Sequence, residues 1–314
     1  MKWSVVMVFM CCAGLAGCVT NYKPGAPDGA VDVIGHRGAS AYAPENTLAA
    51  FELAKRQGAD WFELDCALTQ DEEIIVIHDD DLERTTQGTG LIEDHTLAEL
   101  KKLDAGAWFD PAFAGEPLPT LRESLAMAKG RIGVYVEVKS ADDDGELIRA
   151  LIAAGASHTA MTPELARAMM QLIEDSGTRN LTLTRKVLAE IREKKMARQV
   201  VIQSFSPVVC FVALQEGAEF RVEFLGAKSE EDPGRWQTFL DFGNLIGVHG
   251  FNVHHESLDA EQLNAFHRAG KTCAVWTVDD QEIMVRMVEW GVDGLITNRP
   301  DDCLARLREL QKHP

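Results

Sequence analysis

The chain has 314 residues, with 31 basic and 49 acidic side chains and a net charge of −18. Hydrophobic residues make up 46% and charged residues 25%, an ordinary balance for a folded protein that excludes a disordered or fibrous chain. The acidic surface argues against a nucleic-acid binder, because phosphate backbones attract basic surfaces. A soluble enzyme or a binding domain remains, with enough apolar material for one large domain or two smaller ones.

The first eighteen residues do not fit a folded domain. Lys2 precedes an apolar run over residues 3–15, which is too short to span a bilayer comfortably. The run ends in Leu15-Ala16-Gly17-Cys18, which resembles the bacterial lipoprotein processing box. We therefore expect residues 1–17 to be a signal peptide, Cys18 to be lipidated and residues 18–30 to form a flexible tether. The alternative is an ordinary secretory signal that happens to contain a cysteine.

This interpretation implies a location in the cell envelope, with the protein anchored to a bacterial membrane and facing the periplasm or the exterior. Anionic head groups should repel an acidic body, so attachment would depend on Cys18. The remaining cysteines, Cys66, Cys210, Cys273 and Cys303, show no zinc-type spacing, and the sequence does not pair them. Cys66 and Cys273 lie in strand-like runs, where we expect buried thiols.

From residue 31 onward, short apolar runs alternate with amphipathic stretches. The expected strands are residues 31–35, 61–67, 133–138, 200–205, 220–225, 250–254, 272–277 and 294–297. The expected helices are residues 47–57, 121–129, 146–154, 163–176, 186–196, 207–215, 260–269 and 281–290. This alternation predicts parallel strands joined by helical crossovers, and eight such strands close a TIM (β/α)8 barrel. We assign residues 31–314 to that barrel domain.

One further strand-like run, residues 74–78, follows the second strand after only about four residues. A parallel crossover needs a dozen or more residues, so this run is expected to form an antiparallel hairpin at the rim. Residues 80–119 are long for a loop of this kind and predict a small insertion between strands 2 and 3, with a short helix at residues 97–103. Residues 155–162 and 229–245 are expected to be irregular.

Acidic side chains occur near the carboxyl ends of two strands, where TIM barrels form their active sites. Glu63 and Asp65 are two positions apart, so they point to the same face, and Glu137 lies on the next barrel strand. Three converging carboxylates are costly unless a positive charge neutralises them. A hard divalent cation with oxygen ligands, Ca²⁺ or Mg²⁺, fits this set. The alternative is solvated strand ends with salt bridges.

Basic and imidazole side chains lie at the same predicted rim. Arg37 and Lys139 are suited to holding an oxyanion beside the cation, and His36 and His78 are available for proton transfer. An anion clamp, a metal and two proton-transfer groups indicate hydrolysis of a phosphate ester. Each histidine alone could equally be a structural residue hydrogen-bonded at a strand end, and only the joint placement favours chemistry.

Several short motifs occur in order from about residue 34 to residue 301, and together they resemble the glycerophosphodiester phosphodiesterase family. They are Gly35-His36-Arg37-Gly38, Pro44-Glu45-Asn46-Thr47, Glu63-Leu64-Asp65, His78-Asp79, Arg84-Thr85-Thr86, Pro119-Thr120-Leu121, Glu137-Val138-Lys139, Gln203-Ser204-Phe205, Val275-Trp276-Thr277-Val278 and Thr297-Asn298-Arg299-Pro300-Asp301. One departure is Asn298, which stands where many members have Asp and bears on the final turn. Within Pro44-Glu45-Asn46-Thr47, we expect Asn46 or Thr47 to cap the first helix and Glu45 to brace the histidine loop.

The resemblance implies a TIM barrel with a small insertion, in agreement with the pattern above. It also implies roles for single residues: Glu63, Asp65 and Glu137 as metal ligands, His36 and His78 as the acid–base pair, and Arg37 and Lys139 as phosphate-binding residues. Trp276 would face the glycerol, and Phe205 is a weaker candidate for the same apolar wall. The alternative for Trp276 is an aromatic residue of the barrel core.

The expected function is metal-dependent hydrolysis of glycerophosphodiesters to glycerol 3-phosphate and an alcohol. The expected partners are small soluble diesters and a membrane, reached through the anchor at Cys18, and the sequence indicates no nucleic acid and no obligate protein partner. Two alternatives remain. One is a phospholipase of the same barrel type that acts on lysophospholipids or phosphoinositides. The other is a lipoprotein that binds phosphodiesters without cleaving them.

Overall fold

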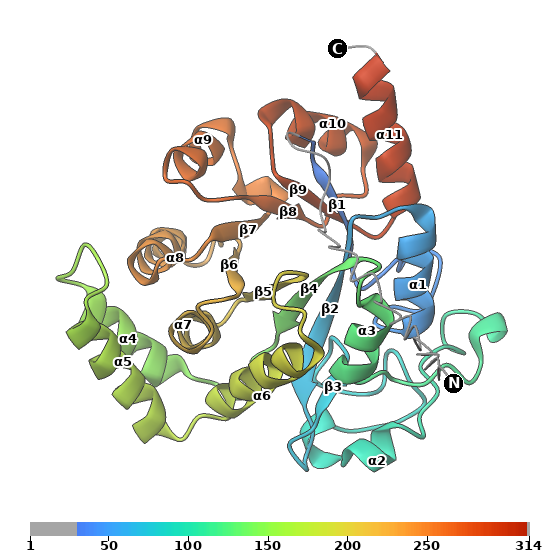
Figure 1. The fold of residues 1–314 in the computed structure, drawn as a ribbon, viewed down its shortest axis with the longest axis horizontal. Coiled ribbons are helices and arrows are strands. Elements are labelled where there is room, and N and C mark those ends of the chain that lie inside the picture. The colour runs from blue at the N-terminus through green and yellow to red at the C-terminus, as the bar shows by residue number, and fades with distance from the viewer. Residues whose placement is uncertain (1–29, 313–314) are drawn as a thin grey trace, which may run out of the picture.

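Eight parallel strands form a closed barrel in the computed structural model, which describes residues 30–312 (Figure 1). The barrel strands are β1 (Asp32–Gly35), β2 (Trp61–Leu68), β4 (Gly133–Val138), β5 (Val200–Ser204), β6 (Arg221–Gly226), β7 (Gly250–His254), β8 (Ala274–Trp276) and β9 (Gly294–Thr297). Each pairs with its neighbour in parallel, and β1 closes the ring by pairing with both β2 and β9. The predicted TIM barrel is confirmed.

The ninth strand lies outside the ring. β3 (Ile74–Val76) pairs antiparallel with β2, with Cys66 opposite Val76 and Leu68 opposite Ile74. This is the predicted hairpin, since the few residues between β2 and β3 cannot hold a crossover. The chain then enters the insertion, which is built from short elements: η1 (Ile92–Asp94), α2 (Leu97–Leu100) and η2 (Pro111–Phe113).

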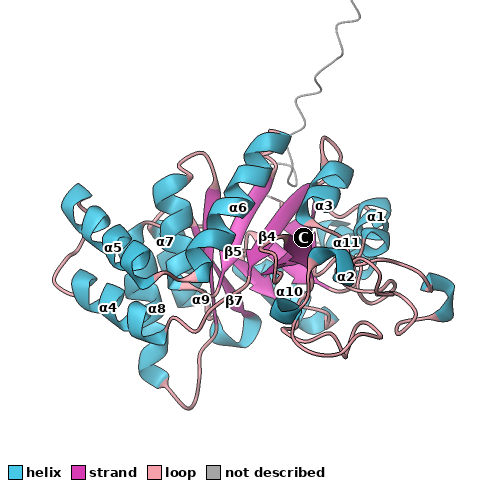
Figure 2. Ribbon diagram, turned by 90° about the horizontal axis from the view of Figure 1, so that it is seen from below, coloured by secondary structure: helices cyan, strands magenta, loops and turns pink. Residues whose placement is uncertain are grey.

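Helices surround the barrel on its outer side (Figures 1 and 2). They are α1 (Leu48–Gln57), α3 (Leu121–Ala128), α4 (Gly145–Gly155), α5 (Pro163–Ser176), α6 (Arg179–Lys194), α7 (Pro207–Glu216), α8 (Pro233–Ile246), α9 (Ala260–Arg268), α10 (Gln281–Trp290) and α11 (Pro300–Lys312), with the short η3 (His255–Ser257) after β7. In Figure 1, α4 and α5 extend furthest from the barrel on one side, and the insertion lies on another.

The expectation of an irregular segment at residues 229–245 is wrong, because α8 occupies most of it. Asp232 caps this helix by accepting a hydrogen bond from the backbone N–H of Arg235, and Pro233 stands in the first turn, where its missing N–H costs nothing. Gly247 ends the helix in a left-handed conformation. The buried residues of α8 begin only at Leu240, and its first turns are mostly exposed, so the apolar pattern in the first half of the segment is weak.

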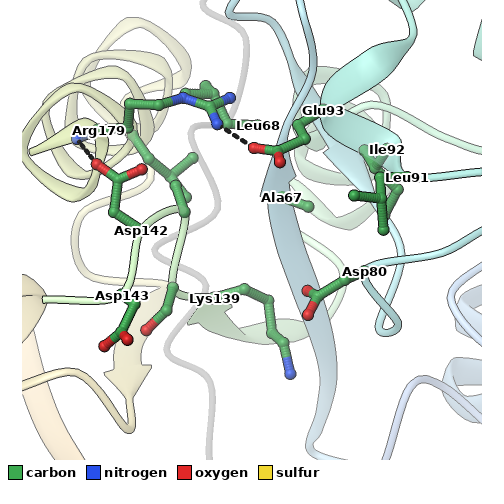
Figure 3. Close-up of a pocket in the computed structure, with 13 residues that line it drawn as sticks. Ala67, Leu68, Asp80, Leu91, Ile92, Glu93, Lys139, Asp142, Asp143 and Arg179 are labelled. Atoms are coloured by element: carbon green, nitrogen blue, oxygen red, sulfur yellow. Dashed lines mark hydrogen bonds and ion pairs between the residues drawn. The ribbon is translucent and has the colours of Figure 1, made fainter. Parts of the chain in front are cut away.

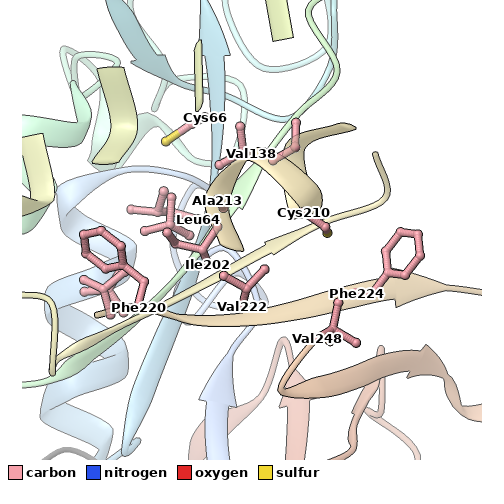
Figure 4. Close-up of a cluster of buried hydrophobic side chains, with 14 of the residues drawn as sticks. Leu64, Cys66, Val138, Ile202, Cys210, Ala213, Phe220, Val222, Phe224 and Val248 are labelled. Atoms are coloured by element: carbon pink, nitrogen blue, oxygen red, sulfur yellow. The ribbon is translucent and has the colours of Figure 1, made fainter. Parts of the chain in front are cut away.

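The core consists of two main layers. Inside the barrel lie Ile34, Trp61, Tyr135, Val201, Ala274 and Ile296. Between strands and helices lies a larger cluster, part of which Figure 4 shows around β5, β6 and α7. Strands of this kind are buried on both faces, which explains their nearly continuous apolar sequences. The cysteines Cys66, Cys210, Cys273 and Cys303 are buried as free thiols, as expected for Cys66 and Cys273.

The insertion has a small core of its own. Ile75, Ile77, Leu82, Ile92, Leu100, Ala105 and Leu118 pack together in it. Because Ile75 and Ile77 belong to the hairpin that extends β2, this core joins the insertion to the barrel rim. The insertion is therefore held beside the carboxyl ends of β1 and β2, where the candidate site residues lie.

The predicted signal peptide, Cys18 and nearly all of the predicted tether lie outside the described residues. Within residues 30–312, no helix is both long and apolar enough to cross a bilayer.

Candidate functional site

Three carboxylates meet at the carboxyl ends of β2 and β4. Asp65 and Glu137 are paired in register on these neighbouring strands. Glu63 lies two residues before Asp65 on β2, so its side chain points to the same face of the sheet. One oxygen from each of Glu63, Asp65 and Glu137 lies within 4.8 Å of the others. All three side chains are buried. The carboxylates therefore converge as the sequence pattern indicated, and their role as metal ligands stays a prediction.

The electrostatics of the cluster fit a cation. Burial raises the pKa of Glu63 well above its ordinary value, and the carboxylates of Asp65 and Glu137 raise it further. Burial and the Asp65 carboxylate raise the pKa of Glu137 to about 7. Three oxygen ligands that repel one another in a dehydrated place are suited to a hard divalent ion, which removes both costs. Among the described residues, this is the one group whose geometry could hold a metal.

Arg37 reaches the same cluster from the loop after β1. Its backbone adopts a left-handed conformation (φ 53°), and its N–H donates to Glu63 Oε2 at 2.8 Å. Gly38 follows at φ 87°, and a Cβ there would lie 2.6 Å from the carbonyl carbon of Ala50. The turn after His36 therefore requires glycine at position 38. The Arg37 guanidinium donates to Glu45 and lies 3.4 Å from Asp65 Oδ2.

Lys139 lies beside the cluster, directly after β4. Its Nζ lies 3.4 Å from Glu137 Oε1. Burial alone would lower the pKa of Lys139, but the Glu137 carboxylate raises it above its ordinary value and keeps the amine charged. Arg37 and Lys139 thus flank the carboxylates as two cations on the same rim, as the sequence predicted.

His36 is oriented by a chain of polar groups. Asn298 donates through Nδ2 to Asp279 Oδ2 at 2.6 Å, so its Oδ1 faces the other way and lies 2.7 Å from His36 Nδ1. An amide oxygen can only accept, so Nδ1 of His36 carries the proton and Nε2 is free. Burial and the Arg37 guanidinium lower the pKa of His36 to about 4. Asn298, which the sequence placed only in the final turn, is therefore the partner of this histidine.

His78 has a charged partner instead. Its Nδ1 lies 2.6 Å from Asp79 Oδ1, and the carboxylate acts as the acceptor. The Arg84 guanidinium and His78 lower the pKa of Asp79 to about 2, although burial opposes them. The two histidines of the site are therefore held by partners of different charge.

Arg84 is a site residue whose position the sequence did not reveal. It donates to Asp79 through Nε, and it donates to both oxygens of Glu45 through Nη1 and Nη2. Burial alone would raise the pKa of Glu45, but Arg84 and Arg37 lower it to about 2. Glu45 thus braces the histidine loop, as expected, and Arg84 links that loop to the insertion. The Arg84-Thr85-Thr86 motif was the available signal.

The sequence predicted that Asn46 or Thr47 caps the first helix, and the structure shows that Thr47 does so. Thr47 caps α1 by accepting a hydrogen bond from the N–H of Ala50. Asn46 does not cap the helix. It donates to Asp65 Oδ2 at 2.8 Å and accepts from the N–H of Asp65, and it thereby orients one carboxylate of the cluster.

Three adjoining cavities open over these residues. The innermost, about 160 Å³, is lined by His36, Arg37, Glu63, His78, Glu137, Gln203, Phe205, Leu225, Trp276, Thr277 and Ile296. A second, about 460 Å³, shares His78, Glu137 and Phe205 with it and includes Lys139. The third, about 400 Å³, extends from Lys139 and Asp80 toward the Arg179–Glu93 ion pair (Figure 3). The site is thus a groove that deepens toward the carboxylates.

Aromatic residues form one wall of the innermost cavity. The rings of Phe205 and Trp276 meet edge to face with centroids 5.5 Å apart. Phe205 is 44% exposed, which is unusual for a large apolar side chain and leaves its ring open to the groove. Trp276 also packs against the barrel core. It is therefore both a residue of the cavity wall and an aromatic residue of the core, the two alternatives that the sequence left open. The structure thus brings all of the predicted barrel-site residues to one rim.

Comparisons with known proteins agree on one family. The model of the glycerophosphoryl diester phosphodiesterase family matches residues 36–302. A glycerophosphodiester phosphodiesterase of Bacillus subtilis is 33% identical over 278 residues, covering 85% of this chain and 83% of that protein. One from Caldanaerobacter subterraneus subsp. tengcongensis is 32% identical over 278 residues, covering 88% of this chain and 98% of that protein.

The solved structures give the same result. The structure of an Oleispira antarctica phosphodiesterase in complex with the product sn-glycerol-3-phosphate matches with a TM-score of 0.68 and 26% identity, covering 88% of this chain and 96% of that chain. A glycerophosphodiester phosphodiesterase from Agrobacterium tumefaciens matches with a TM-score of 0.65 and 28% identity, covering 88% of this chain and all of that chain.

Proposed function

Because this chain belongs to the glycerophosphoryl diester phosphodiesterase family, and is thus a phosphoric diester hydrolase, we propose that it works with one bound divalent cation and two histidines. Its substrates are small glycerophosphodiesters, which it cleaves to glycerol 3-phosphate and an alcohol. The observation that carries the proposal is the buried cluster of Glu63, Asp65 and Glu137 beside two cations and two differently oriented imidazoles.

Glu63, Asp65 and Glu137 would hold the cation, Ca²⁺ or Mg²⁺. The raised pKa values of Glu63 and Glu137 support this role, since carboxylates crowded in a buried place gain most from a bound charge. A bound cation in such a site polarises phosphoryl oxygens and offsets the charge that develops on them. Asn46 and the backbone N–H of Arg37 keep Asp65 and Glu63 in place for that purpose.

Arg37 and Lys139 bind the non-bridging oxygens of the phosphate. Both side chains lie next to the carboxylates. The neighbouring negative charges raise the pKa values of Arg37 and Lys139 above their ordinary values, so both side chains stay charged. Fixed donors of this kind stabilise the transition state because they are already aimed at the oxygens where charge grows. The apolar wall of Phe205 and Trp276 in the same cavity would face the glycerol.

The two histidines divide the proton transfers according to their partners. His36 is neutral at physiological pH and its Nε2 is free, so it takes a proton from the attacking water or glycerol hydroxyl. The Asp79 carboxylate accepts from Nδ1 of His78 and holds the ring in place, and we assign to this histidine the proton transfer to the departing alcohol. His36 is thus the base and His78 the acid.

A substrate panel tests the reaction. Purified protein is incubated with Mg²⁺ or Ca²⁺ and with glycerophosphocholine, glycerophosphoethanolamine or lysophosphatidylcholine micelles, and released sn-glycerol 3-phosphate and choline are measured. We expect glycerol 3-phosphate from the two deacylated diesters. Choline release from the micelles without turnover of the deacylated diesters would instead indicate a phospholipase, and no turnover with either metal would indicate a binding protein.

Substitution of the histidines tests the mechanism. His36→Ala and His78→Ala should each lower kcat on glycerophosphocholine by about a hundredfold or more, the usual contribution of a positioned acid or base. His95, which bonds only a backbone carbonyl in the insertion, supplies the matched control, and His95→Ala should keep wild-type turnover. Near wild-type rates in both His36→Ala and His78→Ala would contradict the mechanism.

We also propose that Cys18 carries a lipid anchor in the cell envelope. The support is the sequence alone: a short apolar run ending in Leu15-Ala16-Gly17-Cys18. Metabolic labelling with a fatty acid in a bacterial host should label the wild-type chain and not Cys18→Ala. Cys12→Ala, within the apolar run, serves as the control and should still be labelled. Equal labelling of wild type and Cys18→Ala would exclude lipidation at this residue.

A further inference from the structure

Gln203 contributes to the innermost cavity although the proposed mechanism gives it no role. It lies on β5 as the register partner of Glu137 on one side and of Glu223 on the other. Its side chain is only 2% exposed, yet it lines the cavity with the histidines. We propose that Gln203 donates a hydrogen bond to a hydroxyl oxygen of the glycerol half of the substrate. This inference rests on the function proposed above.

Glu223 is a buried acidic residue of the barrel interior that is surrounded by hydrogen-bond donors. It is fully buried and forms an ion pair with Arg221. Burial alone would lower the pKa of Arg221, but the Glu223 carboxylate raises it above its ordinary value. Thr272 Oγ1 donates to Glu223 Oε1 at 3.0 Å and itself accepts from Arg221 Nη2. Oε1 of Glu223 thus lies beside the Arg221 guanidinium and the Thr272 hydroxyl, and Oε2 remains to accept from another donor.

Glu223 Oε2 orients Asn252 on β7. Asn252 Nδ2 donates to Glu223 Oε2 at 2.6 Å, and Asn252 Oδ1 accepts from the backbone N–H of Ala274 at 3.2 Å. A backbone N–H can only donate, so the amide of Asn252 fits in one orientation only. Its Nδ2 must face the interior polar groups.

Asn252 in turn orients Gln203. The second hydrogen of Asn252 Nδ2 points to Gln203 Oε1 at 2.9 Å. Only an acceptor fits there, so the NH₂ group of Gln203 faces away from Asn252. In the described part of the chain, Gln203 Nε2 has no hydrogen-bond partner. Gln203 lines the cavity, so a ligand or a water there can accept from this amide.

The surroundings identify the atom that this donor meets. Arg37, which lines the same cavity, and Lys139 already supply charged donors for the phosphate. Gln203 shares its cavity with Leu225, Trp276 and Ile296, an apolar wall suited to a carbon chain. A neutral amide next to such a wall suits a neutral hydroxyl oxygen. Ligands that lack this hydroxyl would bind more weakly, because the amide of Gln203 would then have no hydrogen-bond partner.

Binding of four product-like ligands tests the inference. They are sn-glycerol 3-phosphate, its two deoxy forms (propane-1,2-diol 1-phosphate and 3-hydroxypropyl phosphate) and inorganic phosphate, measured calorimetrically with Mg²⁺ or Ca²⁺ present. Gln203→Leu should weaken glycerol 3-phosphate about tenfold, the value of one well-placed hydrogen bond, and leave inorganic phosphate unchanged. Wild type should bind one deoxy form about tenfold more weakly, and Gln203→Leu should add no further loss for that ligand.

Gln199→Leu is the matched control. Gln199 precedes β5 at the far end of the barrel, where Nε2 donates to the carbonyls of Ala128 and Ile132. This variant should lose stability but not discrimination between ligands. Equal loss of all four ligands in Gln203→Leu, or equal binding of both deoxy forms and glycerol 3-phosphate by wild type, would overturn the inference. The comparison of glycerol 3-phosphate with its two deoxy forms on the wild-type protein still tests the inference if Gln203→Leu does not fold. If wild type hydrolyses no glycerophosphodiester, the proposed function fails instead.

Discussion

Arg84 and Glu45 are 39 positions apart, yet two N–H groups of Arg84 donate to the two oxygens of Glu45, at 2.7 and 2.8 Å. This pair joins the insertion to the loop that carries His36 and Arg37. Arg84 also donates to Asp79. It therefore contacts both the carboxylate beside His78, which is Asp79, and the carboxylate beside Arg37, which is Glu45. The insertion thus takes part in placing the proposed catalytic groups.

Arg84→Lys should therefore impair catalysis although the charge is kept. A lysine cannot bond Asp79 and both Glu45 oxygens at once, because it lacks the planar fork of arginine. We expect kcat to fall on the order of tenfold, with KM changed little, in steady-state assays on glycerophosphocholine. Arg122→Lys, at an exposed ion pair with Glu193, should leave both constants unchanged. An equal effect of both substitutions would show that Arg84 has no positioning role.

Glu63→Gln should separate stability from function. Removing one of three crowded buried carboxylates relieves repulsion, so the metal-free variant should melt above metal-free wild type by roughly 2 to 4 °C, the shift that about 1 kcal/mol produces in a domain of this size. Added Mg²⁺ or Ca²⁺ should raise the Tm of wild type but not of the variant, since a bound ligand stabilises only the state that binds it.

The control for this comparison is Glu164→Gln, which changes an exposed carboxylate on α5. Its Tm and its response to cations should equal those of wild type. A Glu63→Gln protein that melts below wild type without metal would indicate that the three carboxylates stabilise the fold without a cation, contrary to the repulsion inferred from their burial.

The lowered pKa of His36 predicts a pH-dependent stability. In the unfolded chain His36 takes up a proton near pH 6.5, whereas in the folded chain it does so only near 4. Between these values the unfolded state binds more protons, so His36 makes wild type less stable as the pH falls from 6.5 to 4. Denaturant unfolding of wild type and His36→Gln across this window should show that the variant loses less stability. Parallel curves would exclude a lowered pKa.

Asn298→Asp should shift the activity profile. A carboxylate beside His36 Nδ1 favours the imidazolium, so the pKa of His36 rises and the acidic limb of kcat/KM moves to higher pH, by about one unit or more. Because Asp279 lies beside position 298, Asn298→Asp combined with Asp279→Asn avoids carboxylate repulsion. Asp279→Asn alone is the control and should move the limb less than the pair does. An unchanged limb in the double variant would show that His36 is not the base.

Sequence patterns revealed the barrel because its strands are short, apolar and buried on both faces, and because the residues between β2 and β3 are too few for a crossover. They did not reveal α8, since its first turns are mostly exposed and its buried residues begin only at Leu240. The start signal at Asp232-Pro233 was present, but the Gly234 that follows resembles a turn.

In the candidate site too, local sequence patterns predicted some features and missed others. The spacing of Glu63 and Asp65 and their shared strand face predict the cluster, because strand geometry alone determines it. The roles of Glu45, Arg84 and Asn298 depend on how loops from distant parts of the chain fold over the rim. No local periodicity encodes such contacts. Gln203 is a similar case, since its orientation follows from polar groups on β6 and β7.

Hydrolysis should depend on a cation held by Glu63, Asp65 and Glu137, and this dependence is the centre of the proposed mechanism. Its most direct measurement is release of sn-glycerol 3-phosphate from glycerophosphocholine by one wild-type sample before chelation, after EDTA and dialysis, and after addition of Mg²⁺ or Ca²⁺. We predict loss of activity after chelation and recovery with at least one of the two ions, with no recovery in Glu63→Gln. Undiminished release from the chelated wild-type enzyme would contradict the metal dependence.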